Sequence, residues 1–160
     1  MPETIDGLRR VLRAILLIGL AGTTTELLLL KHDEGVAQFI PLVLIAIAFV
    51  TIVWHAVDQG PASLRAFQLT MVLFVGAGAL GIYLHYRANV EFQREVDPSL
   101  AGRALIVKAL TAKTPPALAP GSMSQLGLIG LAYAYRYPLR RRAEKTARAG
   151  VRPSTPGEES

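Results

Sequence analysis

The apolar residues divide this chain into long uncharged runs separated by short charged segments. Val36–Val57 holds 22 residues without a formal charge, and Ala66–Tyr86 holds another 21. A helix rises about 1.5 Å per residue, so each run is long enough as a helix to cross the roughly 30 Å hydrocarbon core of a bilayer. The two runs predict an integral membrane protein.

Two weaker runs flank this pair. Ala14–Leu30 has 17 residues and contains one acid, Glu26. Basic residues precede it, so a cleaved signal peptide is the alternative to a retained helix, but the apolar sequence continues past any cleavage point and favours retention. Pro116–Tyr135 has 20 uncharged residues with a polar first half. A full span is expected there, and a re-entrant or broken helix buried in protein is the alternative.

The connection between the third and fourth runs contains one further predicted helix. Asp97-Pro98 has the pattern of an N-cap followed by proline in the first turn, which predicts a short helix over about 98–112. Its apolar residues spread around the helix, which favours an interfacial helix packed against the bundle. The predicted fold is therefore all-α: an integral membrane four-helix bundle in residues 1–137, with this helix between helices 3 and 4. The predicted spans cover about 11–31, 36–57, 66–86 and 116–137.

Lysine and arginine positions predict the orientation. Four spans put both termini and the turn near Asp58 on one side, which carries eleven Lys and Arg against six on the other. The positive-inside rule then places both termini in the cytoplasm. Residues 138–160 are predicted to be a disordered basic cytoplasmic tail, in which Arg140, Arg141 and Arg142 contact lipid headgroups. A chain rich in Arg, Ala and Pro without cysteine suits a bacterial inner membrane.

Composition limits the available chemistry. The absence of cysteine excludes disulfides, thiolate metal sites and thiol nucleophiles. The net charge of +5 is concentrated in the tail, and the aromatic residues lie beside apolar runs, so nucleic acid is not an expected partner. No serine, histidine and acid arrangement stands out and no phosphate-binding loop is present, which argues against an enzyme.

Glycines in the third run match a dinucleotide-binding motif, but the surrounding sequence does not suit that motif. Gly76, Gly78 and Gly81 form G-x-G-x-x-G, the dinucleotide-binding fingerprint, but that motif requires a preceding strand and here lies inside an apolar run. Small residues in membrane helices let two backbones approach closely, so helix packing is the better interpretation. The glycines expected to pack helices together are Gly19, Gly22, Gly78, Gly81, Gly127 and Gly130.

Glu26 and His85 each follow a glycine stripe toward the outer end of a predicted helix. An acid inside a membrane helix costs a few kcal/mol on insertion scales, so it normally faces protein or water. Glu26 is therefore a functional candidate, although it lies only five residues from Lys31 and can also reach the headgroup zone. Under the predicted topology several polar residues share this depth and form an outer polar pocket. Its candidate residues are Glu26, His32, Gln38, His85, Ser122 and Gln125.

No cofactor is predicted for this pocket. None of its histidines and carboxylates shows the i, i+3 or i, i+4 spacing that indicates a metal site. A divalent metal, or a haem with His32 and His85 as axial ligands, is the alternative. Nearer the inner side, His55 and Asp58 are three residues apart and either share a proton or form a local cap.

The leading functional hypothesis is a non-catalytic accessory or assembly subunit of a larger membrane complex. Small size, abundant small residues and few ionisable groups inside the runs support it. The expected partners are the lipid bilayer and either another membrane protein or further copies of the chain. One alternative is an oligomeric transporter or channel that uses the outer pocket. Another is a membrane redox or metal-binding protein that uses His32, His85 and Glu26.

Overall fold

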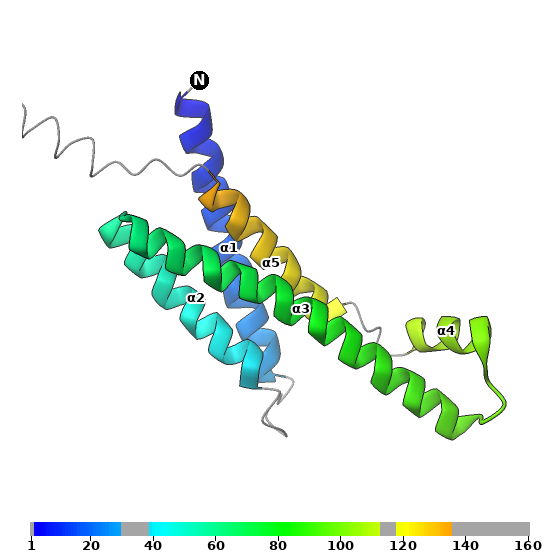
Figure 1. Ribbon diagram of the computed structural model, residues 1–160. Coiled ribbons are helices and arrows are strands. Elements are labelled where there is room, and N and C mark those ends of the chain that lie inside the picture. Colours follow the sequence, from blue (N-terminus) through cyan, green and yellow to red (C-terminus); the bar gives the residue numbers. More distant parts are fainter. Residues whose placement is uncertain (1, 30–38, 113–117, 136–160) are drawn as a thin grey trace, which may run out of the picture.

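The computed structural model describes residues 2–29, 39–112 and 118–135, and every regular element in these ranges is a helix (Figure 1). In chain order the elements are α1 (Pro2–Leu29), α2 (Phe39–Asp58), α3 (Pro61–Val96), α4 (Gly102–Leu110) and α5 (Leu118–Ala134). This confirms the all-α fold class. Among the described helices, α1, α2 and α3 are long and apolar enough to cross a membrane, which supports a membrane protein with transmembrane helices.

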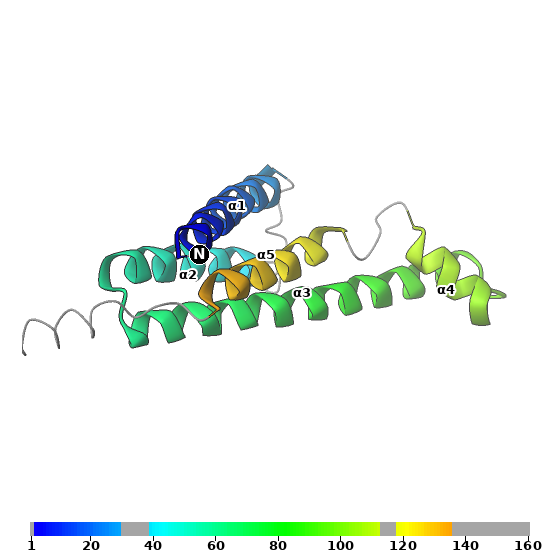
Figure 2. The same ribbon diagram turned by 90° about the horizontal axis from the view of Figure 1, so that it is seen from above.

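The longest helix, α3, packs against α2, α4 and α5 along its length. The α2 helix returns beside its amino-terminal half, α5 lies antiparallel beside its middle, and α4 folds back beside its carboxyl end (Figures 1 and 2). The α1 helix packs mainly on α5 and less extensively on α2. Figure 2 shows that α1 diverges from α3 toward its own carboxyl end.

The α3 helix extends well beyond the uncharged run that predicted it. It has 36 residues and is about 54 Å long at 1.5 Å per residue, which exceeds the roughly 30 Å of a hydrocarbon core. Its carboxyl end projects past α2 and α5 (Figure 1). The residues that follow Tyr86 on this helix include several charged side chains. Arg87 donates to Glu91 one turn later at 3.0 Å, an exposed pair of the kind that supports a solvated helix.

The helix predicted over about 98–112 begins later than expected, and its predicted N-cap was wrong. Asp97 ends α3 instead: its N–H donates to the Gln93 carbonyl at 3.0 Å. The Asp97 carboxylate then accepts from the Ser99 N–H at 3.1 Å and from the Ser99 hydroxyl at 2.5 Å. The N-cap of α4 is Ala101. An aspartate before proline suits a turn after a helix as well as the start of one, and Ser99 selects the turn here.

The interior is a layer of apolar side chains between α3 and the helices around it. Along each helix the buried positions recur every three or four residues, as expected for one face of a helix. The buried core residues on the four long elements include Leu16, Leu20, Ile45, Ala48, Phe67, Met71, Phe74, Met123 and Leu126. Bulky apolar residues also cover the outward faces, especially on α2, where Val50, Val53 and Val57 are exposed. An apolar exterior over a packed apolar interior suits a lipid environment.

The α3 and α5 backbones touch through glycines. A β-carbon at Gly78 would lie 2.6 Å from the Pro120 carbonyl oxygen and 2.7 Å from the Ser124 nitrogen. From the other side, a β-carbon at Gly127 would lie 2.7 Å from the Met71 carbonyl oxygen. Both distances are too short for any residue with a side chain, so glycine is required at each position. Two further glycines lie in the same contact: Gly81 against Pro120, and Gly130 against Met71 and Phe67.

The two glycines of α1 have different surroundings. Gly19 lies against the side chain of Leu126 on α5, so α1 approaches α5 closely at this point. One turn later, a β-carbon at Gly22 would meet nothing within 4 Å. Gly22 therefore lies on an open side of α1, whereas Leu20 and Leu27 on its other side are still buried in the core.

Gly78 and Gly76 form a matched pair for testing the α3–α5 contact. Gly78→Ala places a methyl group against backbone atoms that cannot move cheaply, and we expect it to destabilise the protein by about 1–3 kcal/mol. Gly76→Ala meets open space and should be neutral or stabilising by up to about 1 kcal/mol, because alanine favours the helix. Denaturant unfolding in detergent micelles measures both. Equal stability of the two variants would contradict the contact.

Candidate functional site

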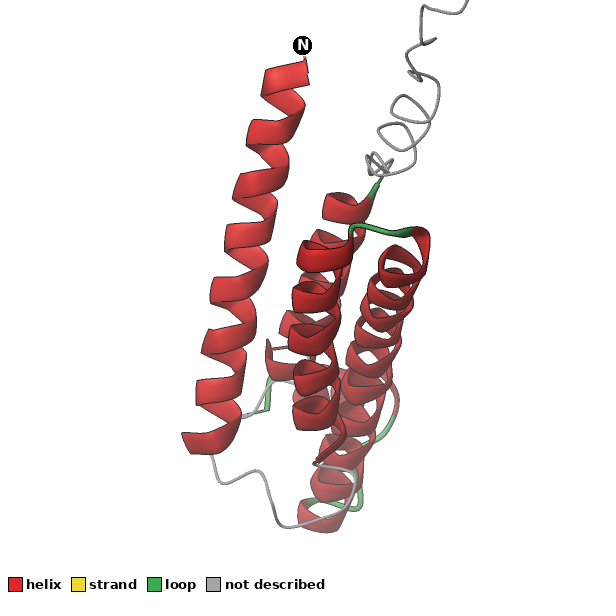
Figure 3. Cartoon of the chain, turned by 90° about the vertical axis from the view of Figure 1, so that its left-hand side faces the viewer, coloured by secondary structure: helices red, strands yellow, loops and turns green. Residues whose placement is uncertain are grey.

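Three segments that are distant in sequence meet at one end of the bundle: the amino-terminal part of α1, the α2–α3 turn and the carboxyl end of α5 (Figure 3). The turn is short because its residues suit it. Gln59 adopts a positive φ of 48°, the Gly60 N–H donates to the Asp58 carboxylate at 3.1 Å, and Pro61 occupies the first turn of α3. Proline at that position loses no helical hydrogen bond.

His55 is buried beside this turn. Its side chain is 1% exposed, and its Nδ1 lies 3.2 Å from the Ser63 hydroxyl across the turn. The Ser63 hydroxyl donates its only hydrogen to the Gly60 carbonyl at 3.0 Å. Ser63 therefore accepts from His55, which assigns the imidazole hydrogen to Nδ1 in the neutral ring.

Aromatic rings from two other helices enclose the imidazole. Phe67 on α3 stacks on His55 with ring centroids 6.3 Å apart and planes 14° apart. Tyr133 on α5 meets His55 edge-on at 6.4 Å and Phe67 edge-on at 5.7 Å. We call His55, Ser63, Phe67 and Tyr133 the inner cluster. One buried hydrogen bond and three ring contacts in this cluster hold α2, α3 and α5 together.

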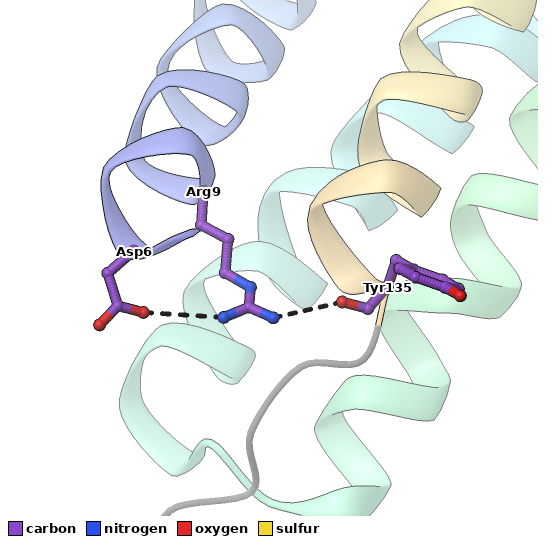
Figure 4. A network of polar contacts seen from close by, with 3 residues as sticks. All are labelled: Asp6, Arg9 and Tyr135. Atoms are coloured by element: carbon purple, nitrogen blue, oxygen red, sulfur yellow. Dashed lines mark hydrogen bonds and ion pairs between the residues drawn. The ribbon is translucent and has the colours of Figure 1, made fainter. Parts of the chain in front are cut away.

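Arg9 joins α1 to the same end (Figure 4). Its guanidinium lies 3.6 Å from the Asp6 carboxylate and donates to the Tyr135 carbonyl at 3.3 Å. Tyr135 directly follows α5, whose last carbonyls have no partner within the helix. A cation at this end also opposes the negative end of the helix dipole. Arg9 thus provides a hydrogen-bond donor for the carbonyl at the end of α5 and a positive charge opposite the negative end of its dipole.

The structure does not bring the predicted outer pocket together in the part of the chain it describes. Glu26 and His85 are both exposed, and the carboxyl end of α1 lies apart from α3 in Figures 1 and 2. Gln125 is exposed on α5 and Ser122 is half-buried there. The described residues contain no group of three or more His, Asp and Glu able to hold a metal ion. His32, Gln38 and the tail residues Arg140, Arg141 and Arg142 lie outside the described residues, so the complete pocket stays a prediction.

The position of Glu26 follows from the path of α1. It lies one turn after Gly22 on the open side of α1, while the next residue, Leu27, is buried in the core. The neighbouring threonines are occupied within the helix: Thr24 donates to the Leu20 carbonyl at 2.7 Å, and Thr25 donates to the Ala21 carbonyl at 2.9 Å. Glu26 is therefore a carboxylate on a helix face that no other described element covers.

His85 lies just past the start of α5. The preceding members of its stripe, Gly78 and Gly81, both lie against Pro120 in the first turns of α5. One turn further along α3, His85 extends beyond that contact and is exposed.

A groove of about 350 Å³ lies between the end of α3 and α4. The Asn89 amide on α3 donates to the Ala109 carbonyl on α4 at 3.1 Å and so joins the two helices that line the groove. Its charged members on α3, Arg87, Glu91 and Arg94, recur at helical spacing, which is a sequence signal that the helix continues past Tyr86. The lining residues are Tyr86, Arg87, Val90, Glu91, Arg94, Gly102, Leu105 and Ile106.

Sequence reasoning also missed the partners of His55. His55 was considered with Asp58, three residues away, whereas the described hydrogen bond is to Ser63, eight residues away. The signal was the turn itself: residues at similar distances before and after a tight helical turn face each other in antiparallel helices. Tyr133 has no such local signal, because only the packing of α5 against α3 places it here.

No protein-family model matches the chain, and comparison with curated proteins and solved structures likewise gives no match. A role must therefore be argued from the described residues.

Ser63→Ala tests the inner cluster. It leaves the buried Nδ1–H of His55 without this acceptor, and we expect a loss of about 1–3 kcal/mol in the free energy of unfolding. Thr4→Ala, a change at an exposed site on α1, should alter it by less than about 0.5 kcal/mol. Unfolding in micelles, followed by circular dichroism, measures both. Equal effects would show that the hydrogen bond does not hold the α2–α3 junction.

The turn after α3 gives a pH-dependent prediction. The hydroxyl and N–H of Ser99 hold the pKa of the Asp97 carboxyl below its usual range. Because the folded pKa is the lower one, this stabilisation is present at neutral pH and is lost as the pH falls through the folded pKa. Ser99→Ala should move the pKa of Asp97 up toward its usual value. Carboxyl titration by NMR measures this shift, and Thr111→Ala on the same hairpin should leave the value unchanged.

Proposed function

We propose that this chain is a non-catalytic accessory or assembly subunit of a membrane complex. It would be anchored by α1, α2, α3 and α5, with both termini in the cytoplasm. The observation that carries the proposal is that two polar side chains, Glu26 and Gln125, lie exposed on outward helix faces. Polar groups at membrane depth are costly against lipid and are normally covered by protein. Outward-facing polar groups therefore favour contact with a further membrane helix.

The depth of Gln125 follows from its neighbours. The uncharged run of α3 has its midpoint near Gly76, and the adjacent Val75 carbonyl accepts a hydrogen bond from Ser124 at 3.2 Å. Gln125 is the next residue along α5, so it lies near the middle of the same run. Its side chain makes no hydrogen bond within the described part of the chain.

Two features support α5 as a fourth span. Its 17 residues reach about 25 Å, at the low end of the lengths that cross a bilayer. Its carboxyl end also meets the amino-terminal part of α1 through Arg9. Arg9, Arg10 and Arg13 lie in the amino-terminal half of α1 and Arg65 lies near the start of α3, so all four belong to this end. The positive-inside rule then supports a cytoplasmic location for the inner cluster and for both termini.

The α4 helix supports an interfacial position on the opposite side. Leu105 and Ala109 pack inward, whereas Ile106, Val107 and Leu110 are exposed. The bond from Asn89 to Ala109 ties α4 to a point only three residues, or about 4.5 Å, beyond the uncharged run of α3. That height falls within the headgroup layer. Its outward apolar side chains and Lys108 would then contact lipid.

The complex itself is tested by purification from native membranes in a mild detergent, with identification of co-purifying chains by mass spectrometry. We expect at least one other polypeptide at a fixed stoichiometric ratio. Glu26→Leu should reduce that ratio about tenfold or more, whereas Val50→Leu, on the apolar outward face of α2, should leave it unchanged. Purification of the chain free of other polypeptides would contradict the proposal, as would equal behaviour of the two variants.

A further inference from the structure

One outward face of α5 carries a heptad-like stripe. Its members are Gly121, Gln125, Leu128 and Ala132 on α5 and Tyr135 directly after it, spaced alternately four and three residues apart. We call them the α5 seam. The last four are exposed, and a β-carbon at Gly121 would meet nothing within 4 Å. Spacing of this kind lets two helices pack along their length.

The described helices leave the α5 seam open. On its other sides α5 meets α1 through Leu126 and α3 through Gly127 and Gly130. In Figure 2 α5 lies between α1 and α3, and no described helix crosses in front of it.

The composition of the α5 seam differs from that of a lipid-facing surface. The outward face of α2 consists of large apolar side chains, among them Val43, Ile47, Val50 and Val53. The α5 seam instead contains two small residues and one carboxamide. Small residues allow a partner backbone to approach closely, which lipid tails do not require.

Gln125 indicates what covers the α5 seam. Its carboxamide has both donors and acceptors, and it makes no hydrogen bond to the described residues. Near the middle of the membrane neither water nor lipid tails can satisfy it. A second carboxamide at the same depth can do so, because two such groups complement each other. A two-fold axis along the membrane normal brings identical residues together at identical depth.

We propose that the α5 seam pairs with the α5 seam of a second copy of this chain, with the two Gln125 side chains hydrogen bonded to each other. The two α5 helices run parallel, and a single polar residue in an otherwise apolar or small seam fixes their register. The inference rests on the four-span arrangement proposed above, which sets the depth of Gln125. It does not require any other polypeptide.

Single-cysteine variants test the geometry, since the chain has no cysteine of its own. Purified protein is reconstituted in phosphatidylcholine vesicles and oxidised with copper phenanthroline. Ala132→Cys and Leu128→Cys in the α5 seam should form disulfide-linked dimers in most molecules. Val50→Cys, which is exposed on α2, is the matched control and should form few. Equal cross-linking at the two faces would overturn the proposal.

Gln125→Leu tests the chemistry. We expect dimerisation in vesicles to weaken by about three- to thirty-fold, the range given by interhelical hydrogen bonds of about 0.6–2 kcal/mol. Fluorescence energy transfer across a series of protein-to-lipid ratios measures it. Unfolding of the protein at high dilution in detergent should not change, because Gln125 has no bond within the described chain. An unaltered dimer in Gln125→Leu would overturn the pairing of the two amides.

The dimer experiments can fail independently of the test of the proposed function. Both dimer experiments use the purified chain alone, whereas the co-purification experiment uses native membranes. A monomer at every protein-to-lipid ratio would overturn self-pairing and leave the accessory role standing. Ala132→Cys that links to a different polypeptide in native membranes, and not to itself in vesicles, would also overturn it. A dimer in vesicles, together with no co-purifying chains from native membranes, would overturn the accessory role and support self-pairing.

Discussion

The close backbone approach of α3 and α5 is the contact on which the rest of the structure depends. Inside a bilayer, lipid tails are as apolar as leucine, so helices associate mainly through van der Waals packing and hydrogen bonds. Gly78 and Gly127 supply both, because they remove side chains from the contact and let Ser124 reach the Val75 carbonyl. The α1 helix packs mainly on α5, so its place in the bundle also depends on this contact.

The inner cluster adds a second constraint at one end only. The tight α2–α3 turn presents Ser63 to His55, and α5 contributes Tyr133 from the other side. With Arg9 on the end of α5, all four long helices are connected there. Nothing comparable joins the other ends of the described helices, where α1 diverges and α3 projects with α4. The asymmetry explains why Glu26 and His85 lie exposed and apart.

The sequence predicts that the helices exist. It predicts less well where each helix ends and which of its sides faces a neighbouring helix. The uncharged run ends at Tyr86, but α3 continues to Val96, and its last turns contain pairs such as Arg87 and Glu91 that support a helix. Gln125 was predicted to belong to the outer polar pocket, because counting residues gives the depth of a side chain but not the direction in which it faces. The rotation of α5 is set by Gly127 and Gly130 against α3, and that contact requires knowledge of both helices at once.

The two outward polar residues require different partners. Two carboxamides satisfy each other, so Gln125 is suited to a symmetric contact. Two ionised carboxylates at the same depth would repel each other, so Glu26 is better suited to a donor or cation from a different chain. The α5 seam lies on α5, whereas Gly22 and Glu26 lie on an open side of α1. The two helices touch at Gly19 and Leu126. Self-pairing through α5 therefore leaves the α1 face available, and a dimer would present two such faces to the other chains of a complex.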